Sequence, residues 1–196
     1  FFFQIKINAQ GKKIEDLSFL ELEHKIDSLF NTNGNALPLV KFYFKKSKKE
    51  NNLKALFYAY RYASQNPSEN YKIKYSDSAI LVAKKINDNS ILAEAYLNKS
   101  TLLFAKKQHD VASNYLMLAN KIAEKTNDDY LKYQTVYFIA QNYLYLGQLS
   151  DAKKEYEKCV KFYSVNLNKS NTFGKNYEMM FIYSLISLID TNSKLN

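Results

Sequence analysis

The side chains that most often carry acid–base chemistry and metal binding are scarce in this sequence. His24 and His109 are the only histidines among 196 residues. His24 lies among charged neighbours in a predicted helix, and His109 falls in a predicted turn. Enzymes bring acids, bases, nucleophiles or metal ligands together, yet the sequence has no metal-ligand spacing, phosphate-binding glycine loop or nucleophile motif. We therefore expect two surface or packing histidines in a protein that is not an enzyme and uses no cofactor or metal.

The single cysteine, Cys159, excludes an internal disulfide bond. It lies at a helix position where small residues recur along the chain. We interpret Cys159 as a core thiol that packs as a small hydrophobic side chain.

The formal net charge of +9 raises the question of nucleic-acid binding. Arg61 is the only arginine, whereas reading bases and clamping phosphates both favour arginine. The densest basic run, residues 45–49, lies near a predicted helix C-terminus, where cations complement the helix dipole. We expect no direct nucleic-acid binding by this chain.

The composition favours an all-α protein. Only four glycines and two prolines occur, and 46% of the residues are hydrophobic. No apolar stretch reaches the length of about eighteen residues that a membrane span requires. The longest candidate, residues 179–189 (MMFIYSLISLI), is predicted to be a buried helix.

The N-terminal stretch FFFQIKINAQ is apolar and ends near a small residue, Ala9. This pattern is typical of the end of a secretory signal peptide, with cleavage after Ala9. Residues 1–12 are therefore expected to be a signal remnant or tail, and the protein to be periplasmic or on the exported side of a membrane. A cytoplasmic location is the alternative.

Internal repetition is the strongest signal in the chain. Similar residues recur at a spacing of forty, too often to result from composition. The matching sets are Ala112 and Ala152; Ala79, Ala119 and Cys159; Ala83 and Ala123; Asn87-Asp88 and Asn127-Asp128; Tyr60, Ser100 and Ala140; and Leu103, Tyr143 and Tyr183.

Each repeat is predicted to be a pair of antiparallel helices. In the clearest unit, a helix over about 131–146 ends at Gly147, whose conformational freedom suits a helix C-terminus. Ser150 is predicted to cap the second helix. Two helices joined by so short a turn must approach closely, which explains the small residue at Ala152. The predicted inward residues of the unit are Val136, Ile139, Ala140, Tyr143, Ala152, Tyr156, Cys159 and Val160.

This unit resembles the tetratricopeptide repeat (TPR), whose first helix carries a large, a small and an aromatic residue and whose second carries two alanines around an aromatic. Val136, Ala140 and Tyr143 correspond to the first set, and Ala152, Tyr156 and Cys159 to the second. The preceding unit matches through Tyr96, Ser100, Leu103, Ala112, Leu116 and Ala119. The resemblance implies a right-handed superhelical array of antiparallel hairpins. The expected units are 13–50, 51–90, 91–130, 131–170 and an extra helix at 175–190, followed by a tail at 191–196.

Stacked hairpins of this kind line a concave groove with their first helices. Aromatic residues with interspersed amides and cations suit an extended peptide or protein segment. Lys54, Arg61 and Asn98 are the nearest equivalents of the family's carboxylate-binding set, but their positions do not reproduce that motif. The residues predicted to face the groove are Lys54, Phe57, Arg61, Leu97, Asn98, Thr101, Tyr137, Gln141, Tyr145 and Tyr177.

The long forty-residue units also resemble the N-terminal sensor arrays of bacterial AraC-type helix-turn-helix regulators. This resemblance implies that the chain senses a ligand or partner for a longer regulatory or signalling protein. A free-standing periplasmic adaptor and a cytoplasmic peptide-sensing domain are the alternatives, and a homodimer is a further option.

Overall fold

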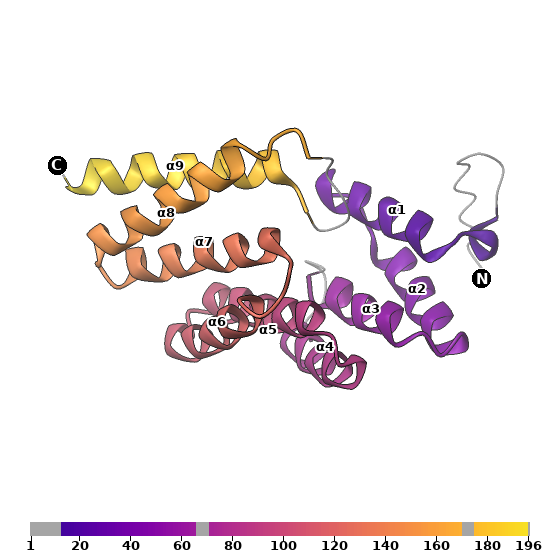
Figure 1. The fold of residues 1–196 in the computed structure, drawn as a ribbon. Coiled ribbons are helices and arrows are strands. Elements are labelled where there is room, and N and C mark those ends of the chain that lie inside the picture. The colour runs from indigo at the N-terminus through magenta and orange to yellow at the C-terminus, as the bar shows by residue number, and fades with distance from the viewer. Residues whose placement is uncertain (1–12, 66–70, 170–174, 196) are drawn as a thin grey trace.

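A computed structural model describes residues 13–65, 71–169 and 175–195 of the chain. The described residues form a short 3-10 turn, Ile14–Asp16, followed by α-helices in sequence order (Figure 1). The predicted tail over 1–12 lies outside the described residues. The helices are α1 (Phe19–Asn31), α2 (Leu37–Lys49), α3 (Leu53–Gln65), α4 (Lys72–Ile86), α5 (Asn89–Ala105), α6 (His109–Ala123), α7 (Asp129–Tyr145), α8 (Leu149–Ser164) and α9 (Tyr177–Leu195).

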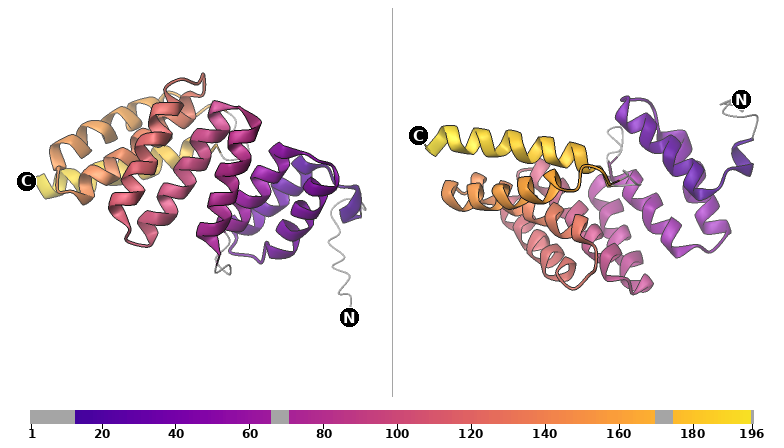
Figure 2. Two further views of the ribbon diagram at one scale, coloured as in Figure 1. Left: turned by 90° about the horizontal axis from the view of Figure 1, so that it is seen from below. Right: turned by 45° about the horizontal axis from the view of Figure 1, so that its top comes forward.

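Each helix packs mainly on the helices next to it in sequence, as antiparallel hairpins do. The hairpins follow one another along a curved array, with the N-terminal and C-terminal ends far apart (Figures 1 and 2). The all-α hairpin array predicted from the forty-residue repeat is therefore confirmed. The predicted unit limits differ in detail, because α5 and α7 each begin two residues before a limit and α9 continues beyond residue 190.

The turns between helices use left-handed backbone conformations. Gly147 ends the α7 turn with φ of +73°, as its position predicts. Lys107, forty residues earlier, adopts φ of +60° without the freedom of glycine. The turns after α1, α2 and α4 use asparagine, the residue other than glycine that enters this region most readily. These asparagines are Asn33, Asn51 and Asn87.

Side-chain caps start several helices, although one predicted cap is wrong. Ser18 and Glu21 form a capping box at α1, and Asp88 and Asp128 cap α5 and α7. Ser150, by contrast, lies inside the first turn of α8, whose N-cap is Gln148 and has no side-chain cap bond. The chain leaves the Gly147 turn directly into helix, which puts Ser150 two residues too late to cap it.

Small residues occupy the crossings between helices. Ala112 and Ala152 are completely buried, as are Ala140 and Cys159. At Ser100, another of these small positions, the hydroxyl donates a hydrogen bond of 2.9 Å to the backbone oxygen of Ala112 and so joins α5 to α6. The forty-residue spacing of small residues therefore marks close helix contacts.

The last helix departs from its prediction as a buried helix. Tyr177, Met180 and Ser184 on one face of α9 are buried, beside a cluster that includes Tyr156 and Tyr163. The opposite face is exposed, including Tyr183 at the predicted aromatic packing position. In the described part of the chain no hairpin partner covers this face. No helix there is both long enough and apolar enough to cross a membrane.

Candidate functional site

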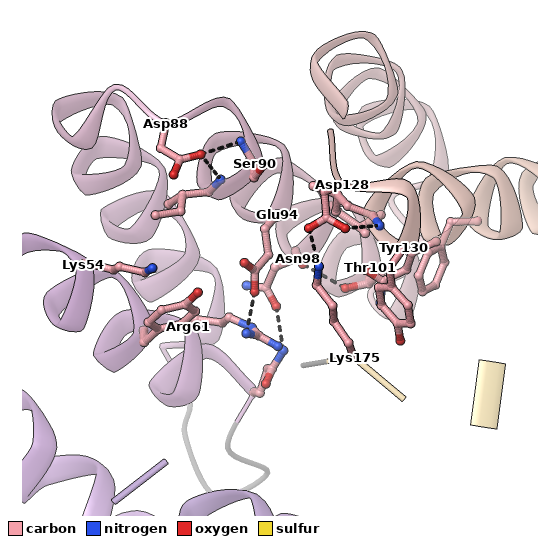
Figure 3. Close-up of a pocket in the computed structure, with 17 residues that line it drawn as sticks. Lys54, Arg61, Asp88, Ser90, Glu94, Asn98, Thr101, Asp128, Tyr130 and Lys175 are labelled. Carbon is pink, nitrogen blue, oxygen red and sulfur yellow. Dashed lines mark hydrogen bonds and ion pairs between the residues drawn. The ribbon is translucent and has the colours of Figure 1, made fainter. Parts of the chain in front are cut away.

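A pocket of about 350 Å³ opens on the concave side of the array, where α3, α5 and α7 lie next to one another (Figure 3). Lys175, just before α9, completes its wall. The lining residues are Lys54, Tyr58, Arg61, Gln65, Asp88, Ser90, Ile91, Glu94, Leu97, Asn98, Thr101, Asp128, Tyr130, Leu131, Gln134, Phe138 and Lys175.

The forty-residue register generates this lining. Lys54, Glu94 and Gln134 are equivalent positions on α3, α5 and α7, and all three line the pocket. The same holds for the set formed by Tyr58, Asn98 and Phe138. Because the first helix of each hairpin presents the same face, the pocket is a row of equivalent positions with different side chains.

An ion pair joins two of the three helices inside the pocket. Arg61 on α3 approaches Glu94 on α5 at 2.5 Å, and the two side chains are 16% and 25% exposed. Arg61 also lies over the ring of Tyr58, with 5.9 Å from its guanidinium carbon to the ring centroid. Burial alone would lower the pKa of Arg61, but the Glu94 carboxylate and nearby groups raise it above its usual value. Arg61 is therefore a permanently charged, fixed part of the wall.

A buried amide network holds the next turn of the same helices. Gln65 donates through Nε2 to Oδ1 of Asn98 at 3.2 Å, and Asn98 donates through Nδ2 to the Ser64 hydroxyl at 2.9 Å. The Thr101 hydroxyl donates to the backbone oxygen of Asn98 at 2.9 Å. Since Asn98 is bonded on both sides of its amide, its role is to fix α5 against α3.

Acidic N-caps line the other rim of the pocket. Asp88 accepts from the backbone nitrogens of Ser90 and Ile91 at 2.8 and 3.3 Å. Asp128 accepts from the backbone nitrogen of Leu131 at 3.1 Å with one carboxylate oxygen and from Lys175 at 2.7 Å with the other. These carboxylates satisfy the amides that would otherwise attract an anion to the helix N-termini.

The two residues just before α9, Lys175 and Asn176, are bound to the start of α7. Besides the ion pair with Asp128, the Lys175 ammonium lies 5.9 Å from the centroid of the Tyr130 ring. The backbone nitrogen of Asn176 donates to the Tyr130 hydroxyl at 3.0 Å. This connection closes one end of the pocket, and Figure 3 shows Lys175 reaching Asp128 across it.

The pocket wall carries balanced charge. Lys54, Arg61 and Lys175 provide three cations, and three carboxylates oppose them: Asp88, Glu94 and Asp128. The overall excess of positive charge on the chain is therefore not concentrated in this pocket.

Half of the predicted groove residues lie in the pocket. Lys54 and Arg61 come from α3, and Leu97, Asn98 and Thr101 come from α5. The ammonium of Lys54 faces the pocket (Figure 3). Whether these residues bind a ligand stays a prediction.

The other half do not line it. Phe57 is completely buried, beside Ala83 on α4. Tyr137 is covered by neighbouring helices and lies 3.4 Å, hydroxyl to hydroxyl, from Ser187 of α9, while Tyr177 is buried beside Tyr130 and Tyr163. Their predicted place in the groove is therefore corrected to the core.

Two more predicted groove residues are exposed but lie elsewhere on the array. Gln141 donates to the Tyr137 hydroxyl at 2.7 Å. Tyr145, at the end of α7, stacks on His109 with ring centroids 3.7 Å apart. They are not among the residues that line the pocket.

The sequence contained a signal for half of the lining residues that were missed. Tyr58, Glu94, Gln134 and Phe138 share a register position with a residue that was predicted correctly, so extending the forty-residue rule would have found them. Asp88 and Asp128 belong to the repeated Asn-Asp dipeptide. Lys175 gave no such signal, because only the path of the chain into α9 brings it to the pocket.

Both histidines and the cysteine lie outside the pocket. His24 is exposed, and His109 packs between Phe104 and Tyr145. Cys159 is completely buried, and burial raises the pKa of its thiol to about 12, which keeps it protonated. Among the described residues, no group of His, Cys, Asp and Glu side chains could hold a metal ion.

The sequence was compared with the profiles of known protein families. A tetratricopeptide repeat profile matches residues 93–126 and 133–166, two segments offset by forty residues. These segments correspond to α5–α6 and α7–α8, the hairpins that contribute most of the pocket. None of the curated proteins matches the chain.

The profile match and the helical hairpins together support a TPR array. The fold is an all-α, TPR-like array of helix hairpins, of the kind that serves as a protein–protein interaction module. Such a fold is typically a scaffold without catalytic activity.

Proposed function

We propose that the chain binds an extended segment of a partner protein in the concave pocket formed by α3, α5 and α7. One observation carries this proposal: three successive first helices present equivalent positions to a single pocket. An extended peptide also presents side chains at a regular spacing, so a row of equivalent positions suits it.

The chemistry of the wall supports a peptide rather than a nucleic acid. Aromatic and aliphatic side chains such as Tyr58, Leu131 and Phe138 offer apolar contact, while Lys54 and Gln134 offer polar contact. The three cations are offset by three carboxylates, two of them in direct ion pairs with Arg61 and Lys175. Phosphates would meet no net positive charge there.

The proposal is tested with a peptide array and two matched variants. An array of 12-residue peptides identifies ligands for the labelled protein, and their affinity is then measured by fluorescence anisotropy. The double variant Lys54→Glu/Gln134→Ala changes the pocket wall without touching the core. It should weaken binding at least about tenfold, the equivalent of 1.4 kcal/mol.

The control variant, Lys85→Glu/Gln148→Ala, makes the same types of change at exposed residues of α4 and of the turn before α8. It should bind with unchanged affinity. Equal losses in both variants, or no ligand in the array, would contradict a groove function. Since the pocket charges are balanced, affinity should depend only weakly on salt, unlike binding to nucleic acid.

We further propose the finer role that the resemblance implies, namely partner sensing for a bacterial regulatory or signalling protein on the exported side of a membrane. Long forty-residue units support this role by resemblance alone. Protease treatment of intact spheroplasts tests it: the protein should be digested there, whereas full protection until lysis would favour the cytoplasmic alternative.

A further inference from the structure

The positive charge of the chain is concentrated on two helices outside the pocket. Between them, α2 and α4 hold nine lysines and one aspartate, a net charge of +8, whereas the whole chain carries +9. Both helices pack on α3, but neither contributes a residue to the pocket lining. In Figure 1, α2 lies below α1 and α4 lies below α3. The exposed lysines of these two helices, here called the basic surface, are Lys41, Lys45, Lys48, Lys49, Lys74, Lys84 and Lys85.

A row of aromatic rings connects the two helices. The ring of Tyr60 on α3 lies with its centroid 4.8 Å from that of Phe44 on α2 and 6.4 Å from that of Tyr75 on α4. The ammonium of Lys48 lies 4.4 Å from the centroid of the Phe44 ring. Because α2 and α4 flank the same part of α3, their lysines belong to one surface.

The nearby carboxylates do not neutralise this surface. Glu50 pairs with Lys46 at 3.0 Å, and Asp77 pairs with Lys99 of α5 at 2.7 Å. Asp88 accepts hydrogen bonds from backbone nitrogens at the start of α5. Within the described ranges, no lysine of the basic surface takes part in an ion pair.

Helix stability explains only part of this lysine arrangement. The helix dipole favours cations near a C-terminus, where four lysines of the basic surface lie. It does not favour Lys41, in the first half of α2, and it disfavours Lys74, in the first turn of α4. Lys45 lies four residues from both Lys41 and Lys49, a spacing at which like charges repel each other. Cations at positions 41, 45 and 74 therefore weaken the helices of the free protein, and an anionic partner would relieve this repulsion.

We propose that the basic surface binds the anionic headgroups of a lipid bilayer, so that the array lies on a membrane with its pocket facing away. Lysine suits a diffuse layer of headgroups, because its ammonium is a point charge without the fixed fork of arginine. Clusters of about four to eight basic residues are typical of surfaces that bind anionic lipid. The inference is independent of the pocket and of any peptide ligand.

Apolar side chains among the lysines favour a lipid partner over a nucleic acid. Tyr71, the N-cap of α4, and Leu81, on the outer face of that helix, are 62% and 63% exposed. Aromatic and aliphatic side chains insert among headgroups at the edge of a bilayer. The phosphate backbone of a duplex offers them no comparable apolar contact.

Cosedimentation of the 196-residue chain with lipid vesicles tests the proposal. The chain should bind vesicles that contain one-third phosphatidylglycerol and should not bind vesicles of phosphatidylcholine alone. Raising the salt from about 50 mM to about 300 mM should weaken binding at least about tenfold, because salt screens exposed charges. Binding to neither kind of vesicle, or to both equally, would overturn the proposal. Stronger binding to a DNA duplex than to the anionic vesicles would overturn it in favour of nucleic acid.

A charge-reversal variant tests the position of the contact. Lys41→Glu/Lys45→Glu/Lys74→Glu should weaken binding to the anionic vesicles at least about tenfold, since each lysine near the bilayer surface contributes to the attraction. The variant should fold, because a carboxylate at position 74 complements the N-terminal dipole of α4 and one at position 45 can pair with Lys49. Circular dichroism checks this.

The matched control, Lys106→Glu/Lys154→Glu/Lys161→Glu, makes the same change in net charge at exposed lysines of the α5–α6 turn and of α8. It should bind within about twofold of wild type, because charges far from the bilayer surface are screened. Equal losses in the two variants would assign binding to net charge alone and would contradict a defined surface.

Tryptophan fluorescence tests whether apolar side chains enter the bilayer. The chain has no tryptophan, so a single introduced one reports its own surroundings. Adding the anionic vesicles should shift the emission of Leu81→Trp to shorter wavelength, because the indole ring enters the membrane interface. Leu146→Trp, at a leucine just after α7 that is 57% exposed, serves as the control and should show no shift. No shift at position 81, or an equal shift at both positions, would show that the chain does not lie on the membrane through the basic surface.

Discussion

At the residue scale, partly buried carboxylates on α1 lie close enough to Arg61 to interact with its positive charge. Asp27 on α1 is half-buried, and burial raises the pKa of its carboxyl to about 6, although the attraction of Arg61 opposes this. Glu23, one turn earlier, accepts a hydrogen bond of 2.5 Å from the Tyr43 hydroxyl. The positive charge of Arg61 therefore attracts the Asp27 carboxylate as well as that of its direct partner, Glu94.

Replacing Asp27 with asparagine should stabilise the protein at neutral pH. Because the pKa is higher in the folded state than the value of about 3.9 in unfolded chains, the folded protein binds more protons between about pH 4 and pH 6. The contribution of Asp27 to stability therefore falls as pH rises through this window. Asp27→Asn should raise the free energy of unfolding by about 1 kcal/mol at pH 7, a value reduced for solvent screening.

Urea unfolding at several pH values measures this effect. The difference between Asp27→Asn and wild type should disappear below about pH 4, where both side chains are neutral. Glu124→Gln, at an exposed position, serves as the control and should stay within about 0.5 kcal/mol of wild type. A stability gain at pH 7 that persists unchanged at low pH would assign it to a cause other than charge.

At the element scale, the repeat determines the hairpins but not the rotation of each helix. Neighbouring residues on a helix differ by about 100° around its axis. This is why predicting Phe57 rather than Tyr58 exchanged a core residue for a pocket residue. Tyr137 and Tyr177 were misplaced for another reason: α9, which begins at Tyr177, packs against α7 and covers Tyr137, and its position cannot be derived from the repeat.

The equivalent turn residues Lys107 and Gly147 provide a reciprocal prediction. Both occupy the left-handed region, with φ of +60° and +73°. Gly147→Ala should cost about 1 kcal/mol of stability, because a Cβ strains this conformation even though it meets no neighbour within 4 Å. Lys107→Gly should stabilise the protein by less than about 1 kcal/mol, since the strain relieved is partly offset by the freedom of glycine in the unfolded chain.

Thermal and urea unfolding of the two variants measure these changes. The two effects should have opposite signs. Destabilisation by both substitutions would mean that the conformation at residue 107 is not strained.

At the scale of the whole molecule, the array is close to one-dimensional. The helix pairs in contact are neighbours in sequence, apart from a few contacts between alternate first helices such as α5 and α7. Among the residues that the structure describes, four clusters of buried residues follow one another along the chain, joined by partly buried residues that neighbouring clusters share, instead of forming one central core. This linear order was predictable, because a fixed spacing of small residues means that each unit packs on the next.

This organisation predicts that a defect at one end stays local. Leu22→Ala should open a cavity in α1 and cost about 2–5 kcal/mol. Ala152→Leu should overpack the α7–α8 crossing, where Ala152 is completely buried, and cost about 1–3 kcal/mol.

In hydrogen exchange measured by mass spectrometry, Leu22→Ala should raise exchange in α1 to α3 and leave α7 to α9 near the wild-type rate. Ala152→Leu should do the reverse, because coupling passes only through the intervening hairpins. A uniform rise along the whole chain for either variant would show that the array unfolds as a single cooperative unit.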